Sequence, residues 1–321
     1  MTAAAVWKVW TALGLVYVVW GSTYLAIRYV VETLPPFLSA AGRFGVAGLL
    51  LAVYLAARRG RSGFRATQRE LLNAAVVGLL LLAGGNGLVT VAEERGLPSG
   101  LAALLVAVIP LWVVVLRASA GDRPAVRTVV GVAIGFVGVA VLLLPGARPA
   151  GVALLPAAMV VLGSFLWSLG SFGATRVPLP RDPLMTTVVQ MAGGASGLLI
   201  AGVVTGEKLR LGEVSAVSWI AWVYLVLFGS IVAFTAYSWL LGVAPVSQVS
   251  TYAYVNPVVA VLLGAVVAGE EVGGATLVGG AVIVLAVAVV VSEEGRRRRA
   301  ALADVAYTAE ERQGRVRRSR T

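Results

Sequence analysis

Ten blocks of about twenty mostly apolar residues follow one another along the sequence, and each is long enough to cross a lipid bilayer as a helix. The blocks predict membrane spans at residues 9–28, 36–57, 71–91, 97–117, 128–145, 152–173, 184–205, 216–241, 246–268 and 275–292. The first block is too long for the apolar region of a signal peptide, and no small-residue cleavage site follows it. Only 13% of the residues are charged, against roughly 25% in soluble domains. We therefore expect an all-α membrane protein with ten transmembrane helices.

Lysine and arginine gather on every second loop, which predicts the orientation in the membrane. If the N-terminus is cytoplasmic, 20 of the 26 basic residues fall on the cytoplasmic side, and the last span also returns the chain to that side. Arg296–Arg299 follow the last span directly and are typical of an anchor to lipid headgroups. The rest of the tail, residues 293–321, is polar and is predicted to be disordered. We expect a multi-pass protein of the cell membrane with both termini in the cytoplasm, the lipid bilayer as a partner and no nucleic-acid partner.

The two halves of the chain match at a fixed offset. Four pairs of identical residues lie 147 positions apart, namely Trp20 with Trp167, Pro36 with Pro183, Pro98 with Pro245 and Pro110 with Pro257. Each half contains five expected spans, and because five is odd the second half must enter the membrane from the opposite side. The pattern predicts two inverted repeats, at residues 1–147 and 148–292, followed by the tail. Such repeats are typical of transporters that work by alternating access.

Several local motifs resemble a known family. The stretches Trp20-Gly21-Ser22-Thr23-Tyr24 through Arg28, Leu34-Pro35-Pro36-Phe37 and Arg43-Phe44 are similar to the first half of an EamA-type transporter of the drug/metabolite transporter superfamily. Ala244-Pro245-Val246-Ser247, Tyr254-Val255-Asn256-Pro257-Val258 and Gly269-Glu270-Glu271 are similar to that family's ninth span and the following loop. The resemblance covers residues 14–292. It implies a bundle of two five-helix repeats and the export of amino acids, related metabolites or drugs without ATP.

Arg43 is the most informative charged residue, because it lies about 10 Å into the second expected span at 1.5 Å per residue. A guanidinium at that depth needs a partner or a water-filled cavity. One interpretation is that it binds an anionic group of a substrate, such as a carboxylate, or gates the outer side. The other is a structural ion pair with Glu32, Glu93 or Glu94 at the same face of the membrane. The two interpretations are compatible if such a pair opens and closes.

Polar and aromatic residues inside the spans mark the expected substrate path. Gln248, Tyr252 and Asn256 recur every four residues on the ninth span, and the alternative role of such a stripe is hydrogen bonding between helices. Trp20 and Trp167 are repeat mates and, with tyrosines nearby, predict an aromatic cage whose alternative is anchoring at the membrane interface. The full set of candidate substrate-binding residues is Trp20, Thr23, Tyr24, Arg43, Asn86, Thr90, Trp167, Tyr237, Gln248, Tyr252 and Asn256.

The composition also excludes several function classes. Cysteine and histidine are both absent, which removes disulfides, thiol nucleophiles and sites that depend on thiolate or imidazole ligands. No phosphate-binding loop of the Walker type occurs. We therefore expect no catalytic residues, no metal, no cofactor and no enzyme activity. The middle of each span lacks Asp and Glu, so a proton relay would need Glu93 or Glu94 at a span edge. A membrane channel or lipid scramblase is the alternative to a transporter, and it is distinguished by the absence of trans-stimulated exchange.

Overall fold

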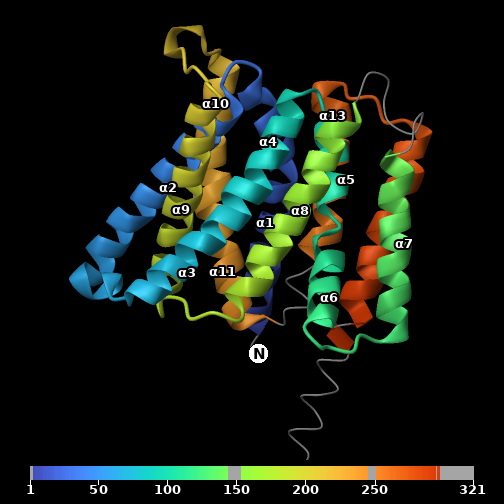
Figure 1. The fold of residues 1–321 in the computed structure, drawn as a ribbon, viewed down its shortest axis with the longest axis horizontal. Helices are drawn as coiled ribbons and strands as arrows, with labels where there is room; N and C mark the ends of the chain where they lie inside the picture. Colours follow the sequence, from blue (N-terminus) through green and yellow to red (C-terminus); the bar gives the residue numbers. More distant parts are fainter. Residues whose placement is uncertain (1–2, 144–152, 245–250, 294, 297–321) are drawn as a thin grey trace, which may run out of the picture.

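The computed structural model describes residues 3–143, 153–244, 251–293 and 295–296. Within these ranges the chain is a bundle of helices without strands (Figure 1). Eight of the described helices are long and apolar enough to cross a membrane, and two further apolar helices, Val126–Leu142 and Val255–Ala268, are shorter. The expectation of an all-helical membrane protein is therefore confirmed.

The first half of the chain contains five helical segments. They are α1 (Ala3–Val31), α2 (Pro36–Arg59), the continuous span of α3 (Gln68–Gly78), η2 (Leu79–Asn86) and α4 (Gly87–Glu94), the bent span of α5 (Ser99–Val106) and α6 (Ile109–Ser119), and α7 (Val126–Leu143). A short 3-10 helix, η1 (Gly60–Phe64), follows α2. Pro36 is the first residue of α2, a position that suits the fixed φ of proline.

The second half repeats this order. It contains α8 (Leu154–Ala174), α9 (Pro183–Val204), the short helix η3 (Leu211–Glu213), the span of α10 (Ala216–Tyr224), η4 (Leu225–Val232) and α11 (Ala233–Val243), then α13 (Tyr252–Ala268) and the last helix Gly274–Glu293. Pro183 begins α9 as Pro36 begins α2. The expected span at 246–268 begins at residues that lie outside the described ranges.

One matched feature of the halves was not expected from the sequence. η2 and η4 are both π-helical segments of eight residues, and they interrupt corresponding spans. A π-helical turn widens the helix and is often found at functional sites. Both segments contribute residues to the cavity described below.

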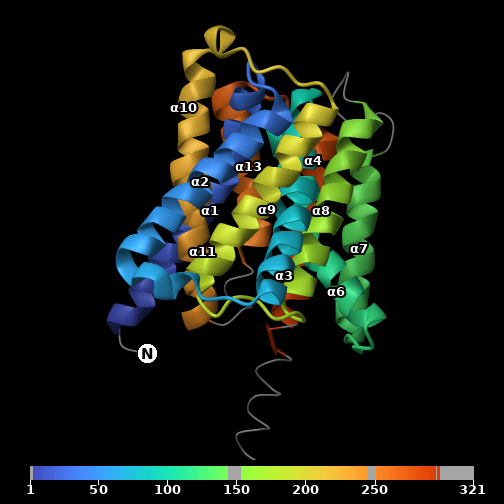
Figure 2. The ribbon, with the colours of Figure 1, turned by 60° about the vertical axis from the view of Figure 1, so that its left-hand side comes forward.

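The loops alternate between two ends of the bundle, and side chains tie neighbouring loops together at each end (Figures 1 and 2). At the end that holds the N-terminus, Arg59 pairs with Asp182 at 2.8 Å. At the opposite end, the Glu207 carboxylate accepts hydrogen bonds from the backbone N–H groups of Phe37 (3.0 Å) and Leu38 (2.8 Å). These N–H groups start α2 and have no partner within the helix. Because the loops alternate between the two ends, α1 and α8, the first helices of the two halves, run in opposite directions (Figure 1).

Glycines allow the helices of the two halves to come very close. A Cβ atom added at Gly78 would lie 2.0 Å from the carbonyl oxygen of Gln190, and one at Gly193 would lie 2.6 Å from that of Ala75. These contacts join α3 and the start of η2 to α9. Small residues at such crossings are the usual means of packing membrane helices. The close contact brings the first-half helices against the second half around the central cavity.

Candidate functional site

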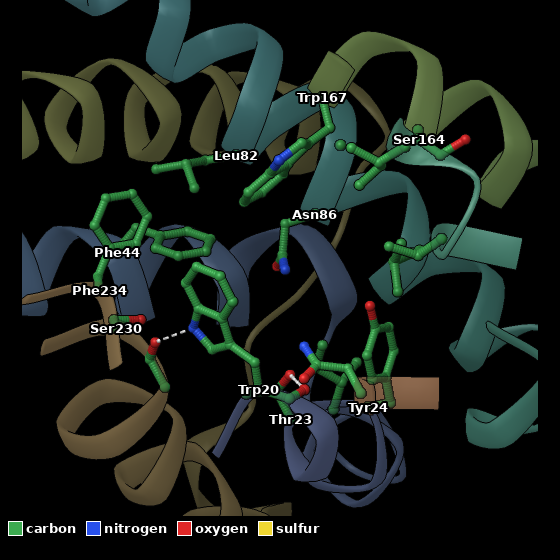
Figure 3. A pocket seen from close by; sticks show the side chains of 18 of the residues that line it. Trp20, Thr23, Tyr24, Phe44, Leu82, Asn86, Ser164, Trp167, Ser230 and Phe234 are labelled. Atoms are coloured by element: carbon green, nitrogen blue, oxygen red, sulfur yellow. Dashed lines mark hydrogen bonds between the residues drawn. The ribbon is translucent and has the colours of Figure 1, made fainter. Parts of the chain in front are cut away.

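A cavity of about 100 Å³ lies in the centre of the bundle, between helices of both halves (Figure 3). Its wall combines aromatic rings, small residues and a few polar side chains. The lining residues are Trp20, Thr23, Tyr24, Ile27, Arg43, Phe44, Leu82, Gly85, Asn86, Val89, Val106, Ile109, Gly163, Ser164, Trp167, Gly229, Ser230, Phe234, Tyr252 and Asn256. A mostly apolar cavity with a small number of placed polar groups is the usual form of a small-molecule site.

Aromatic rings form one side of the cavity. Trp20 of α1 packs against Phe234, Tyr237 and Tyr252, with ring centroids 6.2, 5.1 and 5.3 Å apart. The Trp20 indole N–H donates to the carbonyl oxygen of Gly229 in η4, at 3.2 Å, so the ring is fixed in orientation. The cluster joins α1 to α11 and α13.

Trp167 of α8 contributes a second large ring. Figure 3 shows it on the opposite wall from Trp20, with the Asn86 side chain between them. A Cβ atom at Gly85 would lie 2.9 Å from the Trp167 ring, so the glycine makes room for the indole. The repeat mates Trp20 and Trp167 therefore face one cavity, as their spacing in the sequence predicts.

Arg43 is buried in the cavity wall, with 5% of its surface exposed. Its Nε atom donates a hydrogen bond to the Ser230 hydroxyl at 2.9 Å, and the guanidinium lies 4.7 Å from the centre of the Phe44 ring. Among the described residues, no carboxylate lies within 4 Å of it. The suggested ion pair with Glu32, Glu93 or Glu94 is therefore absent from this conformation, and Ser230 holds the side chain in place.

Asn86 supplies a free acceptor in the same cavity. It is the last residue of η2, and its Oδ1 atom is buried without a hydrogen-bond partner in the described part of the protein. Arg43 offers hydrogen-bond donors and Asn86 offers an acceptor. A buried polar atom without a partner is costly, at about 1–3 kcal/mol, unless a ligand or water satisfies it. The pair is thus suited to a ligand that carries both an anionic acceptor and a donor group.

The structure brings most of the predicted residues together. Eight of the eleven line the cavity, namely Trp20, Thr23, Tyr24, Arg43, Asn86, Trp167, Tyr252 and Asn256. Gln248 lies outside the described residues. Asn256 also has a structural role, because its amide, oriented as its neighbours require, donates to the backbone carbonyls of Tyr17 and Tyr252 at 3.3 Å. This bond joins α13 to α1.

Two predicted residues lie outside the lining. Thr90 is buried, but its hydroxyl donates to the Asn86 carbonyl oxygen at 2.9 Å, so its hydrogen bond is made within its own segment. Helical spacing places it one turn after Asn86, and this hydrogen bond turns its hydroxyl toward its own backbone instead of into the cavity. Tyr237 packs behind Trp20 and Tyr252 instead of facing the cavity.

Sequence reasoning missed three lining residues with evident roles. Phe44 and Phe234 add aromatic wall, and Ser230 holds Arg43. The sequence held a signal for Ser230, because it is one of the few polar residues within the apolar eighth block. Its importance depends on contact with a residue 187 positions earlier in the chain, which no local pattern reveals.

The sequence model of the EamA-like transporter family matches this chain twice, at residues 8–144 and 154–292. The chain belongs to the EamA-like transporter family. The two matches cover nearly all of the helical bundle and give one copy of the family's unit to each half. The EamA-type membership expected from the motifs is therefore confirmed.

Relatives of this EamA-like protein are also transporters by name. An uncharacterized inner membrane transporter of Escherichia coli K12, YedA, is 42% identical over 263 residues, which is 81% of this chain and 82% of the relative. A Salmonella typhimurium protein named as a probable amino-acid metabolite efflux pump is 26% identical over 277 residues, covering 81% of this chain and 89% of the relative. The protein is thus a membrane transporter of the EamA type.

A solved crystal structure resembles the fold of this EamA-like protein. The likeness has a TM-score of 0.61 at 24% sequence identity, and it covers 90% of this chain and 98% of the other. At that identity the comparison supports the arrangement of helices alone.

Proposed function

We propose that this EamA-like protein exports small amphipathic metabolites that carry a carboxylate, such as amino acids or related compounds, by alternating access without ATP. The observation that carries the proposal is the buried Arg43, which has no acidic partner among the described residues and lies in a cavity between the two halves. A substrate carboxylate would supply the missing negative charge.

The other groups of the cavity fit the rest of such a substrate. The Asn86 Oδ1 atom accepts a hydrogen bond from an amine. The Trp20, Trp167 and Phe234 rings provide an apolar surface for a side chain, and an aromatic face also attracts an ammonium group. The name of the Salmonella relative, an amino-acid metabolite efflux pump, agrees with this chemistry.

We further propose ten membrane spans in two inverted repeats, at residues 1–147 and 148–292, with both termini of the chain in the cytoplasm. The alternating loops and the opposite directions of α1 and α8 support this arrangement (Figure 1). At the end that holds the N-terminus, the described loops and helix ends carry Arg58, Arg59, Arg65, Arg69, Arg117, Arg123, Arg127, Arg176 and Arg181. Cytoplasmic loops are the ones enriched in arginine.

A reporter fused after Thr321 tests this topology. Because two sets of five spans return the chain to its starting side, we expect alkaline phosphatase there to be inactive and green fluorescent protein to be fluorescent. A fusion in the exposed loop at Gly212, at the opposite end of the bundle, should give the reverse pattern. Active phosphatase after Thr321 would contradict both the ten-span count and the inverted repeat.

Single cysteines test whether the cavity is the transport path, since the chain has none of its own. We expect cysteine at Asn86 or Tyr252 to react with a small polar thiol reagent and to be protected by substrates. Cysteine at Leu262, which is 60% exposed on the outside of α13, should face lipid and stay unreactive. Reaction at Leu262 together with inert Asn86 and Tyr252 positions would place the path elsewhere.

A further inference from the structure

A charged bridge joins the two halves at the end of the bundle opposite the N-terminus. Arg28 of α1 donates to the Glu270 carboxylate at 2.5 Å. Glu270 also accepts from the backbone N–H groups of Ser99 (2.8 Å) and Gly100 (3.1 Å), which start α5. Glu270 follows Gly269, whose left-handed backbone (φ 62°) ends α13 and turns the chain. The bridge therefore ties the second half to α1 and α5 of the first.

Glu270 is held as an ionised carboxylate. Burial opposes its ionisation, yet the N–H groups of Gly100 and Ser99 and the Arg28 guanidinium together lower the pKa of this carboxyl below its ordinary value. The negative charge of Glu270 is thus matched by the positive charge of Arg28. No second positive charge lies in the bridge.

Glu93, the last residue but one of α4, lies beside this neutral bridge. Its surface is 4% exposed, and neither carboxylate oxygen has a hydrogen-bond partner within the described residues. Both Arg28 and Glu270 lie within electrostatic range of it. An ionised carboxylate without hydrogen bonds, next to a second ionised carboxylate, is strongly unfavourable in a buried place. The neutral, protonated acid is the form that fits this conformation.

We propose that Glu93 is a proton-binding site of this transporter. Protonation of Glu93 holds the outer end closed, because a neutral Glu93 does not compete with Glu270 for Arg28. The inference rests on the proposed function, because the topology proposed there makes the end opposite the N-terminus the outer end. When the bridge separates, Arg28 is released, and water and Arg28 together stabilise the Glu93 carboxylate. Closing the outer end then takes up one proton from the outer solution, and opening returns one.

The titratable groups near Glu93 are few, so we expect it to bind and release its proton in a single step. Of the elements packed against α4, α1 carries Arg28 and the cavity residue Tyr24, α2 carries the cavity residue Arg43, and α5, α8 and η2 carry no titratable side chain. On its own segment, Glu94 and the following Arg95 are exposed. Tyr24 lines the cavity and lies one helical turn before Arg28 on α1. Glu93 is therefore placed to respond both to the bridge and to the cavity.

Thiol labelling tests the proposed role of Glu93 without a substrate. A single cysteine replaces Ile27, a buried cavity residue next to Arg28, and a membrane-impermeant methanethiosulfonate reagent is added outside right-side-out vesicles. A cysteine at the exposed Gly212 corrects for the pH dependence of the thiol itself and reports the sidedness. After correction, we expect labelling of Ile27→Cys to be about tenfold or more slower near pH 5.5 than near pH 8.5, because a bound proton favours the closed end.

Variants of the acid decide the assignment. In Glu93→Gln, which imitates the protonated acid, labelling should be slow at both pH values, whereas Glu94→Gln at the neighbouring exposed position should keep the dependence. Glu93→Asp should also keep it, and this variant serves if Glu93→Gln does not fold. Three results would overturn the proposal: a pH dependence that persists in Glu93→Gln, no dependence in the unmodified chain, or a rate that follows Na⁺ concentration at constant pH. Failure of the proposed export would instead appear as absent substrate exchange with this labelling pattern intact.

Discussion

Replacing Arg43 with lysine is expected to lower transport by about 10- to 100-fold, while expression and melting temperature stay close to those of the unmodified protein. Lysine keeps the positive charge but loses the planar group that can hold a carboxylate at two points. A hydrogen bond to a charged group contributes about 1.5–3 kcal/mol, which sets the size of the loss. Lysine also lacks the Nε atom that Ser230 holds in place. The measurement is uptake of radiolabelled amino acids into proteoliposomes, compared with binding of the same compounds to purified protein.

Two further variants separate a substrate contact from a structural one. Arg43→Gln should abolish transport with little loss of stability, because among the described residues no acid would be left unpaired. Arg58→Lys, an exposed arginine near the end of the same helix, is the matched control and should transport normally. Normal transport by Arg43→Gln would contradict the proposed binding role. A large drop in the melting temperature of Arg43→Gln would indicate a structural role instead.

Gly78→Ala is expected to lower the free energy of unfolding by about 1–3 kcal/mol or more, the usual cost of overpacking. The added methyl group would lie 2.0 Å from the Gln190 carbonyl oxygen, a backbone atom that cannot rotate away. α3 and α9 would have to separate, and the wall of the cavity would shift with them. The measurement is thermal unfolding of the purified protein in detergent, together with the yield of folded protein.

Gly173→Ala is the control for this change. Gly173 lies in α8, and a Cβ atom there would meet nothing within 4 Å. Because alanine is the better helix former by about 1 kcal/mol, this variant should be as stable as the unmodified protein or more so. Equal melting temperatures for Gly78→Ala and Gly173→Ala would show that the α3–α9 contact can relax, contrary to the packing described above.

Helix positions followed from the sequence because the bilayer imposes a simple length and polarity rule on each span. The expected span 36–57 is the observed Pro36–Arg59, and the expected span 184–205 is Pro183–Val204. The fixed offset of Trp20 and Trp167 likewise favours an aromatic cage over anchoring at the membrane interface, and both residues line the cavity. These features depend on local composition or on a repeat, which a sequence displays directly.

The remaining details depend on contacts that a sequence does not display. The π-helical segments at Leu79–Asn86 and Leu225–Val232 have no residue signature, and the sequence does not show that the Thr90 hydroxyl bonds its own backbone. Whether Arg43 meets an acid or a serine is decided by how α2 packs on η4. The burial of Glu93 beside the bridge required the loop after α13 to be placed across α5. Each is a long-range outcome of packing.

Counterflow in proteoliposomes tests most directly the claim that the central cavity is an alternating-access site. Vesicles loaded with an unlabelled amino acid are diluted into a trace of the same labelled compound, for a panel of aromatic and branched-chain amino acids. We predict that at least one compound accumulates transiently, that its uptake saturates and is accelerated by the internal load, and that Arg43→Gln abolishes the effect. Uptake that does not saturate, is not accelerated by the load and is equal in Arg43→Gln would contradict the account and indicate a channel.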